Sequence, residues 1–241
     1  MRCIRVSLVI CVVLVFVATP ARADEPARVA PPFTTARSYS GECLERTGAA
    51  VLLDRCKAEA VSDIDGSIRH SLLLESPGAG ARPGAGWVYA SSTLRGFAFP
   101  PAADKVVFTV SARAASSGGV SGTTLPPWVS SAHMGITMVV ENLACESGCY
   151  GYDSANLIDV RKGHFVNGAF TLAAALRSDD GGSMPAAPVR ISIEVYGDAN
   201  LGTQFYAPIP DTGRVSADLD MQVLGVSFVT HDASDEEQVD P

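Results

Sequence analysis

Two glutamates are candidates for the acid and base of a hydrolase. Glu141 and Glu194 each fall on the polar side of a run in which apolar and polar residues alternate. Glycosidases use two carboxyl groups, roughly 5 to 10 Å apart, that face one cleft. A structural interpretation competes, because an outward carboxylate on a sheet is normally solvated or paired with a cross-strand cation such as Arg190 or Arg113. A hydrolase using both glutamates is therefore an alternative function.

Aromatic residues indicate a second function, in which the protein binds a ligand that stacks on their rings. Tyr150 and Tyr152 directly follow two closely spaced cysteines. A disulfide there would hold both rings rigidly, and rigid aromatic rings make good platforms for sugars or apolar ligands. Packing of the two rings over a sheet end is the alternative. We predict a ligand-binding site made of loop aromatics and three polar neighbours: Trp128, Tyr150, Tyr152, Asp153, Asn156 and Glu146.

Another aromatic group lies on a single predicted strand. Trp87 and Tyr89 share one face of that strand with Phe97 and Phe99. We predict that this face is buried in the core.

Residues 1–23 have the pattern of a secretory signal peptide. Arg2 and Arg5 precede an apolar run over residues 6–17, and small residues lead up to Ala23. The run is shorter than the ~20 residues needed to span a bilayer. We therefore expect cleavage near Ala23, no membrane span, and a secreted, extracellular protein.

Four cysteines remain after removal of the signal peptide, and they predict disulfides. An even number of cysteines in an oxidising compartment is typical of paired thiols. Three connectivities are possible, and proximity favours Cys43 with Cys56 and Cys145 with Cys149. Neither pair has the two-residue spacing of a zinc knuckle, so the pattern disfavours a metal site.

Length and charge limit the possible organisation and partners. The mature chain of 218 residues suits a single large domain. It holds 15 basic and 26 acidic residues, because the signal peptide removes three of the 18 Lys and Arg. Such a surface repels phosphate backbones, so we expect no nucleic acid partner. We predict a flexible leader over residues 24–37, one domain over 38–230 and an acidic disordered tail over 231–241.

Recognised catalytic motifs are absent from the sequence. It contains no Gly-x-Ser-x-Gly elbow, His-Glu-x-x-His helix or phosphate-binding loop, and its four histidines are scattered. We expect a non-catalytic protein without a cofactor. A structural calcium ion is an alternative at three oxygen-rich loops, although plain turns also explain them: Asp63 to Gly66, Asp153 to Asp159, and Asp179 to Gly181.

Alternation of apolar and polar residues predicts an all-β fold. Four clean runs include Val106 to Ala112, Met134 to Val140, Val189 to Val195 and Leu219 to Val223. Less regular strands are predicted over 67–76, 87–99, 158–166 and 169–177, the last two as a hairpin around Asn167-Gly168. Long loops are predicted over 115–131 and 179–188, and one short helix over Gly48 to Ala60. About eight strands separated by Gly, Pro and Ser clusters are typical of an antiparallel sandwich.

The strand order resembles the jelly-roll β-sandwich of secreted carbohydrate-binding modules. The resemblance covers roughly Ser67 to Val229: a first strand, a Trp/Tyr-led second strand, a Gly/Ser/Pro-rich loop and a closing strand from Leu219. It implies a polysaccharide or other cell-surface ligand, with Trp128, Tyr150 and Tyr152 as the exposed aromatics. We therefore expect a secreted or cell-envelope-associated binding protein. The alternatives are the two-glutamate hydrolase and an exported structural or host-interaction domain without a small ligand.

Overall fold

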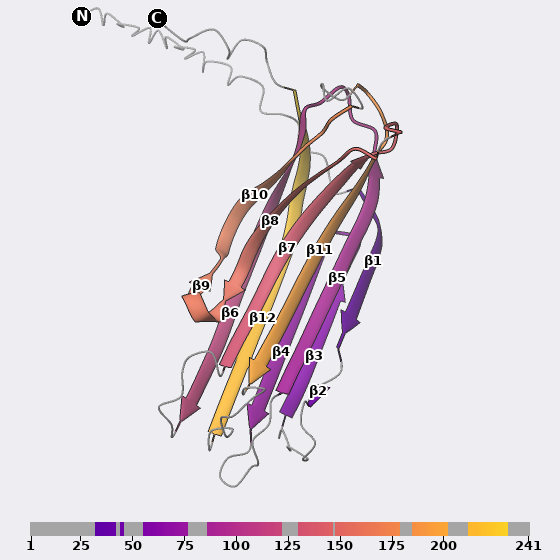
Figure 1. Ribbon diagram of the computed structural model, residues 1–241. Coiled ribbons are helices and arrows are strands. Elements are labelled where there is room, and N and C mark those ends of the chain that lie inside the picture. Colours follow the sequence, from indigo (N-terminus) through magenta and orange to yellow (C-terminus); the bar gives the residue numbers. More distant parts are fainter. Residues whose placement is uncertain are drawn as a thin grey trace, which may run out of the picture.

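Two antiparallel sheets packed face to face make up the described part of the protein. The computed structural model describes residues 32–41, 44–45, 55–76, 86–121, 130–146, 148–178, 185–201 and 212–230. The elements, which Figure 1 shows as a long sandwich, are β1 (Phe33–Ser40), β2 (Leu44–Glu45), β3 (Arg55–Ser62), β4 (Ser67–Ser76), β5 (Gly86–Ala98), β6 (Lys105–Ser121), β7 (Ser130–Asn142), β8 (Tyr150–Asp159), the 3-10 turn η2 (Val160–Lys162), β9 (His164–Phe165), β10 (Asn167–Ala175), β11 (Val189–Leu201) and β12 (Thr212–Val229).

The strand order is that of a jelly roll. One sheet has the order β1-β5-β11-β7-β8-β9, with β2 also paired to β5, and the other has the order β10-β6-β12-β4-β3. Among the eight strands β4 to β8 and β10 to β12, every connection crosses to the opposite sheet except the β7–β8 hairpin. Eight strands connected in this way form a double-sheet jelly roll. The predicted all-β antiparallel sandwich is confirmed.

Period-two alternation builds the core between the sheets. On β5, β7 and β11 every second side chain is buried, and the buried set on β11 is apolar throughout. The largest buried side chains come from both sheets, which is how two pleated faces exclude water together: Ile68, Leu72, Leu74, Leu94, Phe108, Met134, Ile136, Met138, Leu157, Ile158 and Leu172.

The N-terminal part of the fold corrects two predictions. Residues 55–60 of the predicted helix belong to strand β3, whose side chains alternate between half-buried and exposed, while residues 48–54 lie outside the described residues. The predicted leader ends earlier than expected, because β1 begins at Phe33 and pairs with β5. Phe33 is buried in the core, so its burial anchors residues that composition alone assigned to a linker.

The predicted Asn167-Gly168 hairpin is wrong. The chain after β8 makes the turn η2, ends it at Gly163 in the left-handed conformation (φ 62°), and then crosses to the other sheet. Asn167 and Gly168 lie inside β10 and pair with Arg113 and Ala112 of β6. The hairpin that includes β8 lies earlier, between β7 and β8. The predicted loop over 115–131 is also shorter, since β6 extends to Ser121 and β7 starts at Ser130.

The face of β5 that carries its aromatic residues is not the core face, contrary to prediction. Val88, Ala90 and Leu94 are fully buried, whereas Phe97 and Phe99 are exposed. Both faces of this strand carry apolar residues, so alternation alone could not choose between them. The buried side of β5 carries mostly small residues, whereas β4 of the opposite sheet carries the larger buried side chains of Leu72 and Leu74.

No helix in the described part of the chain has the length and hydrophobicity needed to cross a membrane.

Candidate functional site

Aromatic side chains gather on the outward side of the seven-stranded sheet, which we call the aromatic face. The register of the strand pairs places seven of them on this side: Tyr39, Trp87, Tyr89, Phe97, Tyr150, Tyr152 and Tyr196. The outward side of the five-stranded sheet carries no aromatic side chain among its described residues. Since large exposed apolar groups are the informative exception on a soluble protein, the aromatic face is the candidate site.

Tyr150 and Tyr152 are the most exposed tyrosines of this face, at 70% and 69%. They are two residues apart on β8, so both rings point to the same side. The predicted exposure of this pair is thus seen, although the rings lie on the sheet surface at the start of a strand. Tyr152 shares a register row with Arg95, and Tyr150 shares one with Arg190.

The hairpin before Tyr150 is tightly braced. Cys145 and Cys149 form a disulfide, as predicted. The buried Asn142 accepts a hydrogen bond from the Ala144 amide (3.0 Å) and donates one to the Arg177 carbonyl (3.1 Å), and its own amide donates to the Cys149 carbonyl (2.9 Å). Such bonds fix the start of β8 and therefore the two tyrosines. Cys56 is also disulfide-bonded, while Cys43, its predicted partner, lies outside the described residues.

A second aromatic group lies at the other end of the same face. The ring of Tyr89 stacks on Trp87 and on Tyr39, with centroid distances of 4.8 Å and 5.4 Å. Gly41 donates a backbone hydrogen bond to the Tyr89 carbonyl (2.8 Å), and a side chain at Gly41 would meet the Tyr89 ring at 2.6 Å. Nearby, burial raises the pKa of Tyr196, and the charge of Asp198 adds to that effect.

The other residues of the predicted ligand-binding site do not form a single cluster. Asn156 lies on the aromatic face, where its side-chain oxygen is 3.0 Å from Nε2 of His133. Glu146 is exposed in the hairpin. Asp153 is wrongly predicted, because it faces the opposite side of β8 and its Oδ2 accepts a hydrogen bond from the Ala173 amide of the other sheet (2.8 Å). Trp128 lies outside the described residues.

The two glutamates of the alternative hydrolase do not form a catalytic pair. Glu141 and Glu194 lie on neighbouring strands, but Glu141 pairs in register with Arg190, four residues before Glu194. At about 3.3 Å per residue they are about 13 Å apart along the sheet, beyond the roughly 5 to 9.5 Å that glycosidases use. Glu141 accepts two hydrogen bonds from Arg190, and Glu194 lies 4.0 Å from Arg95. Both glutamates are therefore explained by pairing with an arginine on a neighbouring strand, which is the structural interpretation.

The acidic loops considered for calcium are occupied by turn hydrogen bonds where the structure describes them. At the β3–β4 turn, Oδ1 of Asp63 accepts from the Ile64 amide (2.6 Å) and Oδ1 of Asp65 accepts from the Ser67 amide (2.8 Å). Asp159 caps η2 by accepting from the Lys162 amide (3.3 Å). Among the described residues no group of three or more His, Cys, Asp or Glu side chains is arranged to hold a metal, and Asp179 to Gly181 lie outside them.

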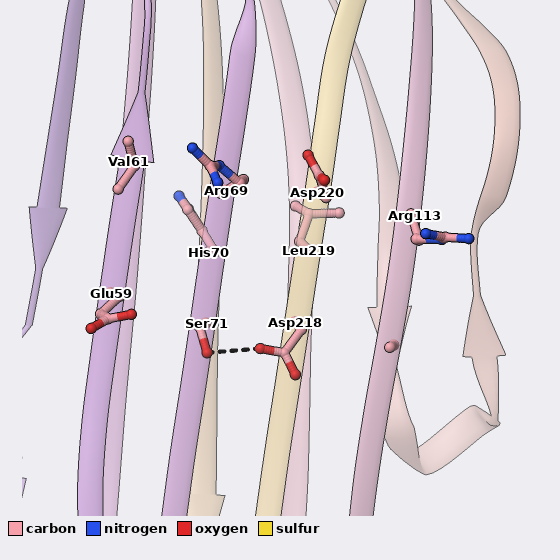
Figure 2. A pocket seen from close by; sticks show the side chains of 10 residues that line it. Glu59, Val61, Arg69, His70, Ser71, Arg113, Asp218, Leu219 and Asp220 are labelled. Atoms are coloured by element: carbon pink, nitrogen blue, oxygen red, sulfur yellow. Dashed lines mark hydrogen bonds between the residues drawn. The ribbon is translucent and has the colours of Figure 1, made fainter.

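A hollow of about 410 Å³ lies on the outward side of the five-stranded sheet (Figure 2). Asp220 stands in one register row between Arg69 and Arg113, and Asp218 accepts a hydrogen bond from Ser71 (2.7 Å). The alternating charges and the absence of Phe, Tyr and Trp among the lining residues suit a solvated surface.

No protein-family model matches the sequence, and no curated protein sequence matches it.

The chain is similar in structure to a protein solved for a study of "the promiscuous specificity of the carbohydrate-binding modules from the beta-sandwich super family". The identity is 10%, the TM-score is 0.33, and the match covers 88% of this chain and 64% of that one. It is also similar to the N-terminal CBM22-1-GH10 modules of an endo-1,4-beta-D-xylanase of Clostridium thermocellum complexed with xylohexaose, with 10% identity, a TM-score of 0.22, and coverage of 64% and 24%. The chain thus spans less than two thirds of either structure, and neither overlap assigns it to a family.

Proposed function

We propose that this protein is a secreted, non-catalytic saccharide-binding domain. The observation that carries the proposal is the pair of exposed rings of Tyr150 and Tyr152, two residues apart on β8 and braced by a disulfide hairpin. Sugar rings have apolar faces that stack on aromatic rings, and a ring held in place before binding loses little entropy when the ligand arrives.

An extended ligand suits this surface better than a small molecule. The aromatic face is open and broad, and its second group of rings, Tyr39, Tyr89 and Trp87, lies several register rows away from Tyr152. A polysaccharide would contact many such positions at once. Asn156 and Ser154 lie beside Tyr152 on β8 and offer hydrogen bonds to hydroxyl groups.

The oxidised cysteines agree with export. A disulfide joins Cys145 and Cys149, and Cys56 is also bonded. Disulfides persist mainly in oxidising compartments. Together with the signal-like residues 1–23, they support a protein that acts outside the cytoplasm.

The test is glycan binding by the mature chain and its tyrosine variants. Titration calorimetry against polysaccharides chosen from a glycan array should show binding, and Tyr150→Ala and Tyr152→Ala should each weaken it about tenfold, which is about 1.4 kcal/mol per lost ring. Tyr150→Phe should retain most of the affinity, because it keeps the ring.

A matched control removes an exposed apolar side chain elsewhere. Ile64 is 52% exposed at the β3–β4 turn, so Ile64→Ala should leave glycan affinity unchanged. If no polysaccharide binds, or if Ile64→Ala weakens binding as much as the tyrosine variants do, the proposal fails.

A further inference from the structure

Three arginines surround a hollow of about 430 Å³ on the aromatic face. Arg37 comes from β1, Arg95 from β5 and Arg190 from β11, so three adjacent strands each contribute one. The remaining lining residues are three threonines and one exposed ring: Thr34, Thr35, Thr93 and Phe97. Basic groups are concentrated here although the chain as a whole holds only 18 Lys and Arg against 26 Asp and Glu.

The register sets the spacing of the arginines. Arg37 pairs with Thr93 and Arg95 pairs with Ser192, which makes Arg95 a diagonal neighbour of both Arg37 and Arg190. Diagonal neighbours on a sheet are about 7 to 8 Å apart at the backbone, within reach of long side chains. Three guanidinium groups can therefore approach the same ligand.

An irregularity in β1 shapes the edge of the hollow. The register shifts between Phe33 and Thr35, and the hydroxyls of Thr34 and Thr35 donate to the Arg95 carbonyl (3.4 and 3.5 Å). Gly96 lets the β1 backbone approach closely, because a side chain there would collide with Pro32. Thr34 and Thr35 therefore line this edge of the hollow beside Arg95.

The three arginines differ in how strongly each is already paired with a carboxylate. Arg190 is hydrogen-bonded to Glu141, whereas Arg95 only approaches Glu194 at 4.0 Å with both side chains more than half exposed. Arg37 has no ion-pair partner among the described residues. A guanidinium carries five donors and binds a carboxylate through two of them. Arg37 and Arg95 therefore have donors available for an anionic ligand.

We infer that the hollow binds carboxylate groups of an acidic polysaccharide whose sugar rings stack on Tyr150 and Tyr152. This inference rests on the proposed function. Arg95 and Tyr152 lie in one register row, three strand spacings or about 14 Å apart. A polysaccharide that crosses the strands meets both.

Charge density favours a carboxylate sugar over a nucleic acid. An acidic polysaccharide bears its charges singly on separate rings, and the face offers Arg95 beside Phe97 on β5, with Tyr152 three strands away in the register row of Arg95. The acidic body of the protein repels a polyphosphate chain along its whole length.

The experiment compares two polymers that share one sugar backbone and differ in whether its carboxylates are free or methyl-esterified. Titration calorimetry at pH 7 would use polygalacturonate and its fully methyl-esterified form, with dextran sulfate as a test of charge alone. We expect polygalacturonate to bind at least tenfold more tightly than the ester and than dextran sulfate. Arg37→Gln combined with Arg95→Gln should remove this preference and leave binding of the ester unchanged.

A matched control carries the same loss of charge on the other sheet. Arg69→Gln combined with Arg113→Gln removes two exposed arginines from the hollow of Figure 2 and should not alter binding of either polymer. The inference is overturned if polygalacturonate does not bind, if it binds no better than its ester or dextran sulfate, or if both double variants lose affinity equally. Loss of ester binding by Tyr150→Ala together with unchanged polygalacturonate binding by the Arg37/Arg95 variant would refute the inference and leave the proposed function standing.

Discussion

His70 on β4 and Ser92 on β5 are joined across the interior of the sandwich by a hydrogen bond of 2.8 Å between Nε2 and Oγ. Ser92 is also 3.1 Å from Ser38 of β1, which is 2.8 Å from Ser62 of β3. The chain of polar groups ties both sheets together at their shared edge. His70 is only 2% exposed, and its Nδ1 has no hydrogen-bond partner.

This buried histidine predicts that stability falls in mild acid. Burial lowers the pKa of His70 from 6.5 to about 4. As the pH falls, the unfolded chain therefore takes up a proton on His70 that the folded chain excludes. The free energy of unfolding is unaffected by this proton above pH 6.5 and decreases as the pH falls towards 4. The loss should reach about 3 kcal/mol, at about 1.4 kcal/mol per pKa unit.

Urea unfolding at a series of pH values between 4 and 7.5 measures this effect. His70→Gln keeps a donor for Ser92 but does not titrate, so its free energy of unfolding should vary less with pH over that range. Parallel curves for the two proteins would contradict the assignment. Hydrogen bonds from Ser67 lower the pKa of Asp65 below 3.8, so the stabilising contribution of Asp65 is lost only at pH values below this window.

Gly151 should be irreplaceable for steric reasons. A side chain at this position of β8 would collide with the Ala175 carbonyl oxygen of β10, where the two sheets meet. Gly151→Ala should lower the free energy of unfolding by about 1 to 3 kcal/mol, the usual cost of overpacking. Gly135→Ala is the control, since its added carbon meets nothing nearer than 3.5 Å, and it should be neutral or slightly stabilising. Equal effects in chemical denaturation would rule out the steric explanation.

Asp153 should matter for stability and not for binding. Its carboxylate accepts hydrogen bonds from the amides of Ser154 and Ala173, both at 2.8 Å, and the second links the two sheets. Asp153→Ala should destabilise the protein by about 1 to 2 kcal/mol, the range of a partly exposed bond to a charged group. Glycan affinity of the folded variant should equal that of the parent, whereas Asn156→Ala should weaken it. A fall in affinity for Asp153→Ala at full folding would restore Asp153 to the site.

The disulfide of the β7–β8 hairpin should support both stability and affinity. Replacing Cys145 and Cys149 by Ser releases a short loop, and loop-closure entropy predicts a loss of about 2 kcal/mol. Tyr150 directly follows Cys149, so its ring should become less ordered and glycan binding should weaken. Thermal unfolding and calorimetry measure the two effects. Unchanged glycan affinity would show that the strand pairing with β7 orders Tyr150 without the disulfide.

Residue patterns in the sequence were sufficient to predict most strands and the disulfide between Cys145 and Cys149. β4 occurs with the predicted bounds, and β6, β7, β11 and β12 contain the clean alternations, because a strand between a core and solvent must alternate. Proximity was a sufficient guide for Cys145 and Cys149, which a short turn brings together. Tyr150 and Tyr152 were predicted as loop aromatics because they follow Cys149, whereas the structure places both on strand β8, where residues two apart share a face.

Local patterns failed where a long-range contact decided the conformation. The spacing of apolar residues before Cys56 suggested a helix, but pairing with β4 makes residues 55–62 a strand. Asn167-Gly168 has the composition of a tight turn, yet both residues lie inside β10 and pair with Arg113 and Ala112 of β6. Pairing energy from a neighbouring strand outweighs local preference in both cases.

By itself the sequence determined that most of the chain forms strands and that Tyr150 and Tyr152 follow a turn closed by two near cysteines. Only the tertiary structure decided which face of β5 is buried, that Asp153 turns away from the tyrosines, and that Arg37, Arg95 and Arg190 meet around one hollow. The reason is that a side chain's face depends on the register between strands far apart in sequence, and a shift of one residue reverses it. The pattern within one strand holds no information about that register.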